Sequence, residues 1–158
     1  MSFEPPVLNP ALNLTTASSV TGLTTTSKTL LGSITIKGGQ MGLNDCLIIL
    51  ADWFVTNSAG NKTIDIDFGS TNVLTTTASG QSGQTVMVMI HNRNSLSSQL
   101  CNQVAVTAFY GASSNSFVSA TENTANDITI SFFGTVATAN ADTITLENLS
   151  PFIWKNNG

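Results

Sequence analysis

Few side chains in this 158-residue chain could do acid, base or nucleophilic chemistry. It has one histidine, two cysteines and nine acidic residues. His91 ends a predicted strand beside Asn92 and Arg93, and a Ser-His-Asp set could be drawn from almost any of the serines, so the pattern does not indicate a triad. The spacings of a G-x-S-x-G elbow, an H-E-x-x-H zinc site and a phosphate-binding loop are absent. We therefore expect no catalytic residue and predict that the protein is not an enzyme.

Metal or cofactor binding finds little support in the residue pattern. Asp65 and Asp67 lie two apart, on one face of an alternating segment, and could share a calcium ion with Asn61. Calcium takes six to eight oxygens, however, and the acidic loop of an EF-hand is absent. A solvent-facing strand is the preferred interpretation, so we expect no metal and no cofactor.

The two cysteines, Cys46 and Cys101, lack the close paired spacing of a zinc site or a redox motif. A single disulfide between them remains open, because strands distant in sequence can be neighbours. We prefer two small buried thiols, made in a reducing cytosol.

Three aromatic residues could bind a sugar by stacking, since an aromatic ring suits the C–H face of a pyranose. They are Trp53, Tyr110 and Trp154. Packing in a hydrophobic core explains each of them equally well.

The composition indicates which elements must position these residues. Only 9% of residues are charged, against roughly 25% in an average protein, while 23 are Thr, 18 Ser and 16 Asn. Threonine loses rotamer freedom in a helix and packs well on a sheet, so the chain is predicted to be all-β. The net charge of −4 and the scattered basic residues argue against a nucleic-acid partner. The longest apolar run, residues 46–51, is far short of the ~20 residues of a membrane span.

Short alternating segments with turn signals between them follow from residue 33 onward, which is typical of a sandwich or barrel. The clearest predicted strands are residues 33–37, 46–55, 62–68, 85–91, 103–110, 127–138 and 142–149, with short segments at 73–74 and 117–118 and a terminal apolar hook at 151–154. About eight strands predict an antiparallel β-sandwich, specifically a jelly roll, with an immunoglobulin-like sandwich as the alternative.

Residues 1–30 differ from the rest of the chain. They contain three prolines and a Ser/Thr-rich stretch, and they show no sustained alternation. Such a segment cannot bury enough apolar surface to offset its own ordering entropy. We therefore predict an extended N-terminal arm over residues 1–30 that lies on a neighbouring subunit, with a flexible tail as the alternative, and a sandwich domain over residues 31–158.

Two predicted strands are apolar on both faces. Residues 46–55 are apolar for most of their length, and Met87 and Met89 lie opposite the Val/Ile face of residues 85–91. Both patterns indicate strands that are covered on both sides, either by another subunit or inside the sandwich. The predicted subunit interface consists of Leu47, Ile49, Trp53, Met87 and Met89.

The order of strand and turn types resembles the jelly-roll modules of tailed-bacteriophage virion proteins, namely capsid decoration (cement) proteins and tail-fibre heads. The resemblance rests on GSITIKGGQMGLND, LIILADWFVTNSAGNKTIDIDFG, TVMVMIHNRNSLSSQ and ATANADTITLENL, and it covers residues 32–149. It implies a homotrimeric, sometimes dimeric, β-sandwich that binds a protein lattice or a host surface. It carries no catalytic motif.

Decoration fits the chain better than a tail fibre, because a fibre normally has a long shaft before its tip and only about 30 residues precede this sandwich. The expected partners are then further copies of the chain and the major capsid protein. The expected location is the capsid surface, after synthesis in the host bacterial cytoplasm. The alternative is a tail-fibre tip or lectin-like module that binds a receptor or glycan. The predicted capsid-binding arm residues are Phe3, Pro5, Pro6, Val7, Leu8, Leu12 and Leu14.

Overall fold

The computed structural model describes residues 18–21, 27–80, 82–105, 117–137 and 142–156, of which 18–21 and 103–105 are described by their backbone alone. The described residues form ten β-strands and no helix. The strands are β1 (Ser18–Thr21), β2 (Thr29–Ile36), β3 (Cys46–Val55), β4 (Lys62–Phe68), β5 (Thr71–Ala78), β6 (Gly83–Asn92), β7 (Gln99–Ala105), β8 (Val118–Ala120), β9 (Ile128–Val136) and β10 (Thr143–Trp154).

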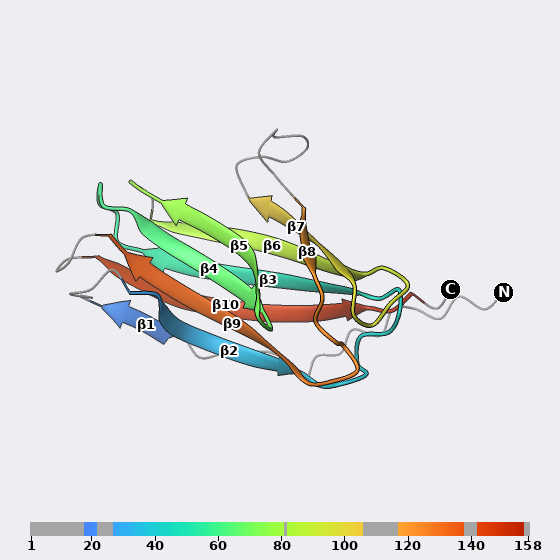
Figure 1. Cartoon of the computed structure of the whole chain (residues 1–158). Coiled ribbons are helices and arrows are strands. Elements are labelled where there is room, and N and C mark those ends of the chain that lie inside the picture. The colour runs from blue at the N-terminus through green and yellow to red at the C-terminus, as the bar shows by residue number, and fades with distance from the viewer. Residues whose placement is uncertain (1–17, 22–26, 81, 106–116, 138–141, 157–158) are drawn as a thin grey trace.

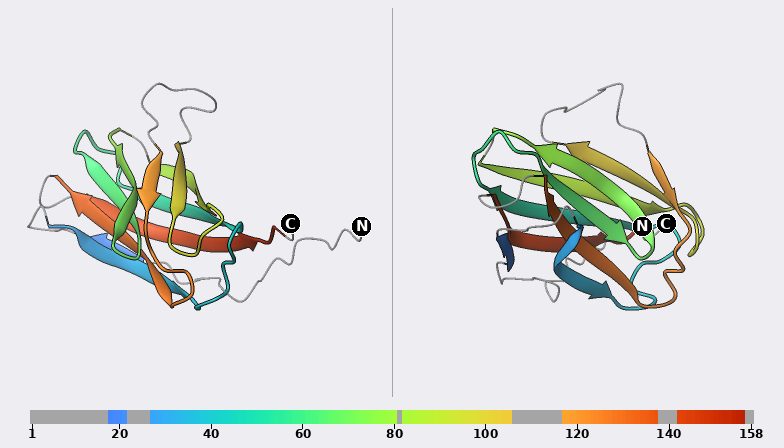
Figure 2. Two further views of the ribbon diagram at one scale, coloured as in Figure 1. Left: turned by 45° about the vertical axis from the view of Figure 1, so that its right-hand side comes forward. Right: turned by 60° about the vertical axis from the view of Figure 1, so that its left-hand side comes forward.

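The strands make two sheets that lie face to face (Figure 1 and Figure 2). One sheet has six strands in the order β1-β10-β3-β6-β7-β8, the other has four in the order β2-β9-β4-β5, and all pairs are antiparallel. If β7 and β8 are left out and the remaining eight strands are renumbered in chain order, the first sheet has the order 1-8-3-6 and the second has the order 2-7-4-5. This is the order of a jelly roll, with β7 and β8 inserted after its sixth strand. The predicted all-β antiparallel sandwich is confirmed.

The core lies between the sheets and is made by alternate residues of each strand. In β4 the buried residues Ile64, Ile66 and Phe68 alternate with half-buried Thr63, Asp65 and Asp67, as the sequence predicts. The inward side chains of β3, β6, β9 and β10 meet those of β4 in one continuous hydrophobic cluster.

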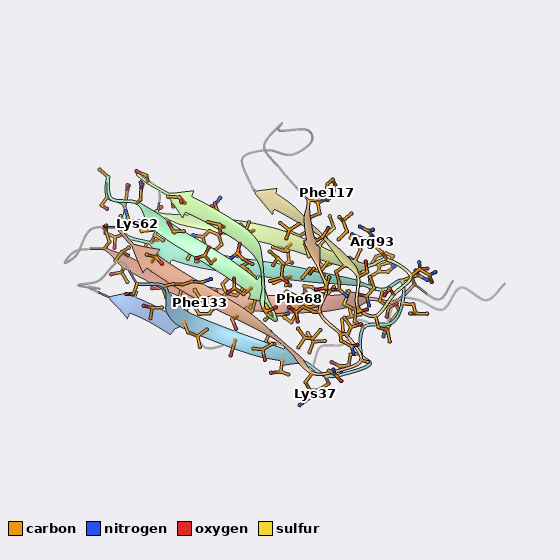
Figure 3. The ribbon with its side chains drawn as sticks, viewed as in Figure 1. Lys37, Lys62, Phe68, Arg93, Phe117 and Phe133 are labelled. Atoms are coloured by element: carbon orange, nitrogen blue, oxygen red, sulfur yellow. The ribbon has the colours of Figure 1, made fainter. Side chains whose placement is uncertain are left out.

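At one end of the sandwich, a lysine is completely buried. The Lys62 ammonium donates to the carbonyl of Ser58 at 3.0 Å, to the Ser58 hydroxyl at 2.5 Å and to the carbonyl of Gly60 at 2.7 Å, and it lies 3.7 Å from the Asp142 carboxylate. Figure 3 places Lys62 at the end of the sandwich opposite Lys37. Because the buried charge has these partners, it holds the β3–β4 turn against the start of β10.

At the other end, buried polar side chains join the loops. The Asn92 amide donates to the carbonyl of Gly42 at 2.7 Å and to the Thr124 hydroxyl at 3.0 Å, and Gln99 donates to the Asn92 carbonyl oxygen at 2.9 Å. These bonds satisfy loop groups that water does not reach.

Glu122 ties the β8–β9 connection to the β4–β5 turn. Its carboxylate accepts hydrogen bonds from the backbone of Ser70 at 2.8 Å and from the Ser70 hydroxyl at 2.6 Å. The turn needs Gly69, whose φ is +60° and whose position would place a Cβ 2.4 Å from the Glu122 carboxyl carbon. The hydrogen bonds from the Ser70 side chain and backbone outweigh partial burial and lower the pKa of Glu122.

Two sequence predictions change in the structure. Residues 18–21 and the start of β2 belong to the sandwich, although both fall within the range 1–30 that was assigned to the arm. The strand β1 has no alternating signal of its own and exists through its pairing with β10. The expected hook at residues 151–154 is a continuation of β10, because a bulge between Leu146 and Asn148 lets the strand keep its pairing with β3.

Candidate functional site

The outer face of the six-stranded sheet carries an apolar patch in its centre. Cross-strand pairing places Ile48 between Phe152 and Met89, and Leu50 between Ser150 and Met87. Residues directly opposite each other on antiparallel strands point to the same side of the sheet. We call Ile48, Leu50, Met87, Met89, Phe152 and Trp154 the apolar face; none of them is fully buried, and Trp154 is 56% exposed.

A row of polar residues bounds the apolar face on one side. Asp52 accepts hydrogen bonds from the Thr85 hydroxyl at 2.6 Å and from the Asn148 amide at 3.0 Å, and Ser150 donates to the Asn148 carbonyl oxygen at 2.9 Å. Phe54, 53% exposed, lies beyond this row. The row therefore separates Phe54 from the other apolar residues of the face.

The predicted subunit interface is partly wrong. Leu47 and Ile49 are completely buried and Trp53 is 3% exposed, because all three face the other sheet. Only Met87 and Met89 lie on the outer face. The sequence missed Ile48, Leu50 and Phe152 because both sets of alternate residues in β3 are apolar. Asp52 could have identified the outer side of β3. It lies on the same side of the strand as Ile48 and Leu50, and a carboxylate there indicates that this side faces outward.

The three candidate stacking aromatics are not brought to one surface. Trp53 is buried in the core and cannot contact a sugar, which corrects its prediction. Trp154 is on the outer face, and Tyr110 lies outside the described residues. The predicted arm residues Phe3, Pro5, Pro6, Val7, Leu8, Leu12 and Leu14 also lie outside the described residues.

The two cysteines are free and buried, which confirms the preferred prediction over a disulfide. Burial raises the pKa of Cys46 to about 11 and that of Cys101 to about 12. Cys46 lies 3.6 Å from the Nε2 of His91, a contact that the sequence did not reveal. Because burial disfavours the thiolate, this pair does not form an activated nucleophile.

The carboxylates of Asp65 and Asp67 already have ion-pair and hydrogen-bond partners within the protein. Lys28 lies 2.8 Å from the Asp67 carboxylate and 3.8 Å from that of Asp65, and Thr75 donates to Asp65 at 2.5 Å. In the part of the chain that the structure describes, no three His, Cys, Asp or Glu residues are grouped closely enough to hold a metal ion.

A groove of about 420 Å³ lies at one end of the apolar face, between Trp154 and His91. Asp45 fixes its surroundings by accepting hydrogen bonds from the backbone of Gly42 at 2.7 Å, from the backbone of Asn156 at 2.9 Å and from Lys155 at 3.0 Å. Burial raises the pKa of Asp45, but these hydrogen bonds and the Lys155 charge outweigh it and leave the pKa below its usual value.

None of the described residues forms a helix that is long and apolar enough to cross a membrane. No protein-family model matches the chain, and no curated protein matches it. Among solved structures, it is similar to a chain in the structure of infectious bursal disease virus Gx strain, with 13% identity and a TM-score of 0.30. The match covers 98% of this chain and 43% of that one, so this chain spans less than half of its length.

Proposed function

We propose that this chain is a non-enzymatic structural protein of a bacteriophage particle, most specifically a capsid decoration protein. It forms a trimer through the apolar face, with a dimer as the alternative. It binds the major capsid protein through its N-terminal arm. The location is the outer surface of the capsid. The observation that carries the proposal is the apolar face on a chain with only 9% charged residues.

The low charge supports a protein that is packed among neighbours. Burying a charged group without a partner is costly, whereas hydroxyls and amides can be covered when they find hydrogen bonds. The Asp52 carboxylate beside the apolar face already accepts hydrogen bonds from Thr85 and Asn148. This part of the surface can therefore be covered with little electrostatic cost.

The size of the face explains why the proposal includes the arm. From Cys46 to Leu50 there are four steps of ~3.4 Å, or about 14 Å, and β10, β3 and β6 together are about 14 Å wide. The projected area is about 200 Å², against the ~800 Å² per partner of a standard interface. The residues outside the sandwich would supply the remainder, and contacts to several subunits at once would make release slow.

The first test concerns the oligomer. Leu50→Glu should weaken self-association at least tenfold, measured as mass against concentration by analytical ultracentrifugation, because it places a charge in the covered face. Thr129→Glu, on an exposed position of β9, is the matched control and should associate like the wild type. A wild-type chain that stays monomeric at high micromolar concentration would contradict the proposed interface.

The second test concerns the arm. Deletion of residues 2–17 leaves β1 and β2 intact, whereas deletion to residue 30 would remove sandwich strands. The shorter deletion should abolish binding to capsids that lack the protein, measured by co-sedimentation, while the oligomer persists. Undiminished capsid binding by the truncated chain would contradict the proposal that the arm binds the capsid.

A further inference from the structure

The groove at the end of the apolar face is built by a small residue between two rings. Cys46 on β3 pairs with Trp154 on β10 and with His91 on β6, so one cross-strand row reads Trp154, Cys46, His91. All three lie on the outer side of the sheet, Cys46 is 8% exposed, and the two rings are exposed. The three residues line the groove together, and the short cysteine side chain between the rings lies 3.6 Å from the Nε2 of His91.

The rim of the groove carries neutral polar groups. The side chains of Asn44 and Asn156 line the groove, are exposed, and make no hydrogen bond to another described residue. Each amide has both donors and an acceptor, which matches hydroxyl groups that both donate and accept. Among the residues that the structure describes, no Asp, Glu, Lys or Arg lines the groove, and the neighbouring charges of Asp45 and Lys155 are paired with each other at 3.0 Å.

The floor is apolar and uncharged. Ile48 and Met89 form it together with Cys46, whose raised pKa keeps the thiol protonated at neutral pH. An apolar floor and an aromatic wall suit the C–H surface of a sugar ring.

We propose that this groove binds a pyranose ring of a neutral sugar, which stacks on Trp154 and is held at its hydroxyls by Asn44, Asn156 and His91. This site is independent of capsid binding by the arm. Its wall, Trp154, and its floor, Ile48 and Met89, belong to the apolar face, so a sugar and a second subunit would compete for them. The sugar therefore binds copies of the chain whose apolar face is not covered at this end, and those copies gain a receptor-binding role.

The test uses the full-length protein on an array of neutral oligosaccharides that contain hexose and N-acetylhexosamine, followed by saturation-transfer NMR with the best binder. Wild-type protein should bind at least one such glycan, and Trp154→Ala should lose at least tenfold in affinity. Cys46→Leu should cause a comparable loss of affinity, because the larger side chain fills part of the groove while Trp154 and His91 are retained. Phe54→Ala, which removes a similarly exposed aromatic on the same sheet, is the control and should bind like the wild type.

Two outcomes would overturn the site. These are no glycan bound by the wild type, or equal binding by Trp154→Ala. Because Trp154 belongs to the apolar face, the decoration role is tested with Asn44→Ala, which changes only the rim of the groove. This variant should bind the glycan more weakly than the wild type and co-sediment with capsids equally, so the failure of this site is distinguishable from failure of the decoration role.

Discussion

The outer faces of the two sheets are built from different residues. The six-stranded sheet exposes Ile48, Leu50, Met87, Met89 and Phe152, whereas the four-stranded sheet presents mainly threonines: Thr35, Thr63, Thr75, Thr77, Thr129 and Thr135. The hydroxyls of Thr63 and Thr77 face each other across β4 and β5 at 3.3 Å. Threonine has the β-branched shape that a strand favours, and its hydroxyl can form hydrogen bonds with water. The threonine face can therefore stay in contact with water, whereas covering the apolar face would be energetically favourable.

The aromatic residue on the threonine face supports this contrast. Phe133 on β9 lies next to Leu30 on β2, and the Lys28 ammonium lies 4.3 Å from the centre of the Phe133 ring. Figure 3 shows Phe133 on the outside of β9. The same ammonium pairs with Asp67 at 2.8 Å. Here a charged side chain covers the aromatic ring, whereas nothing comparable is seen over Trp154 among the described residues.

The largest expected effect comes from comparing neighbours on β3. Ile49→Ala should lower the free energy of unfolding by about 2–5 kcal/mol, since Ile49 is completely buried. Ile48→Ala, one residue away on the outer face, should cost under about 1 kcal/mol in the dissociated chain. Urea unfolding at low concentration measures both, and equal losses would contradict the assignment of the two sides of β3.

The carboxylates at the ends of the sandwich should give the next largest effect. Asp45→Asn should cost about 1.5–3 kcal/mol at pH 7, because three hydrogen bonds to a charged group are weakened. The pKa of Asp45 is lowered from 3.8 in the folded state, so its contribution is complete above 3.8 and is lost as the pH falls through the folded value. Stability measured against pH should therefore fall less steeply below pH 4 in this variant than in the wild type.

Asp127 provides the control for that measurement. Its pKa is also lowered, first by the hydrogen bond from Lys37 and then by that from the backbone of Gly38, but the carboxyl is fully exposed. Asp127→Asn should leave the urea midpoint at pH 7 nearly unchanged, because solvent screens the pair. A loss as large as that of Asp45→Asn would show that exposure does not separate the two sites.

The smallest effect is expected on the threonine face. Lys28→Ala should cost about 0.5–1 kcal/mol, the usual value of an exposed cation–π contact. It should also uncover Phe133 and increase binding of a hydrophobic dye to the protein. Lys28→Met, which retains an apolar cover without the charge, should restore low dye binding; failure to do so would mean that the cover does not depend on the lysine stem.

Alternation of apolar and polar residues was sufficient to locate most strands and the core side of β4. Together with the threonine-rich composition it predicted an all-β sandwich, and the spacing of the cysteines favoured two unpaired thiols. Alternation could not orient β3, because Leu47 and Ile49 are as apolar as Ile48 and Leu50. It also missed that Lys62 is buried, because the hydrogen bonds to Ser58 and Gly60 and the ion pair with Asp142 form only after folding.

By itself, the sequence determined the fold class, since threonine-rich segments of period two favour strands and leave no amphipathic helix. It also determined the low charge that suits a packed protein. Only the tertiary structure decided which side of each strand faces outward, because that depends on which strands pair and in what register. The apolar face and the row of Trp154, Cys46 and His91 both result from three strands distant in sequence meeting side by side.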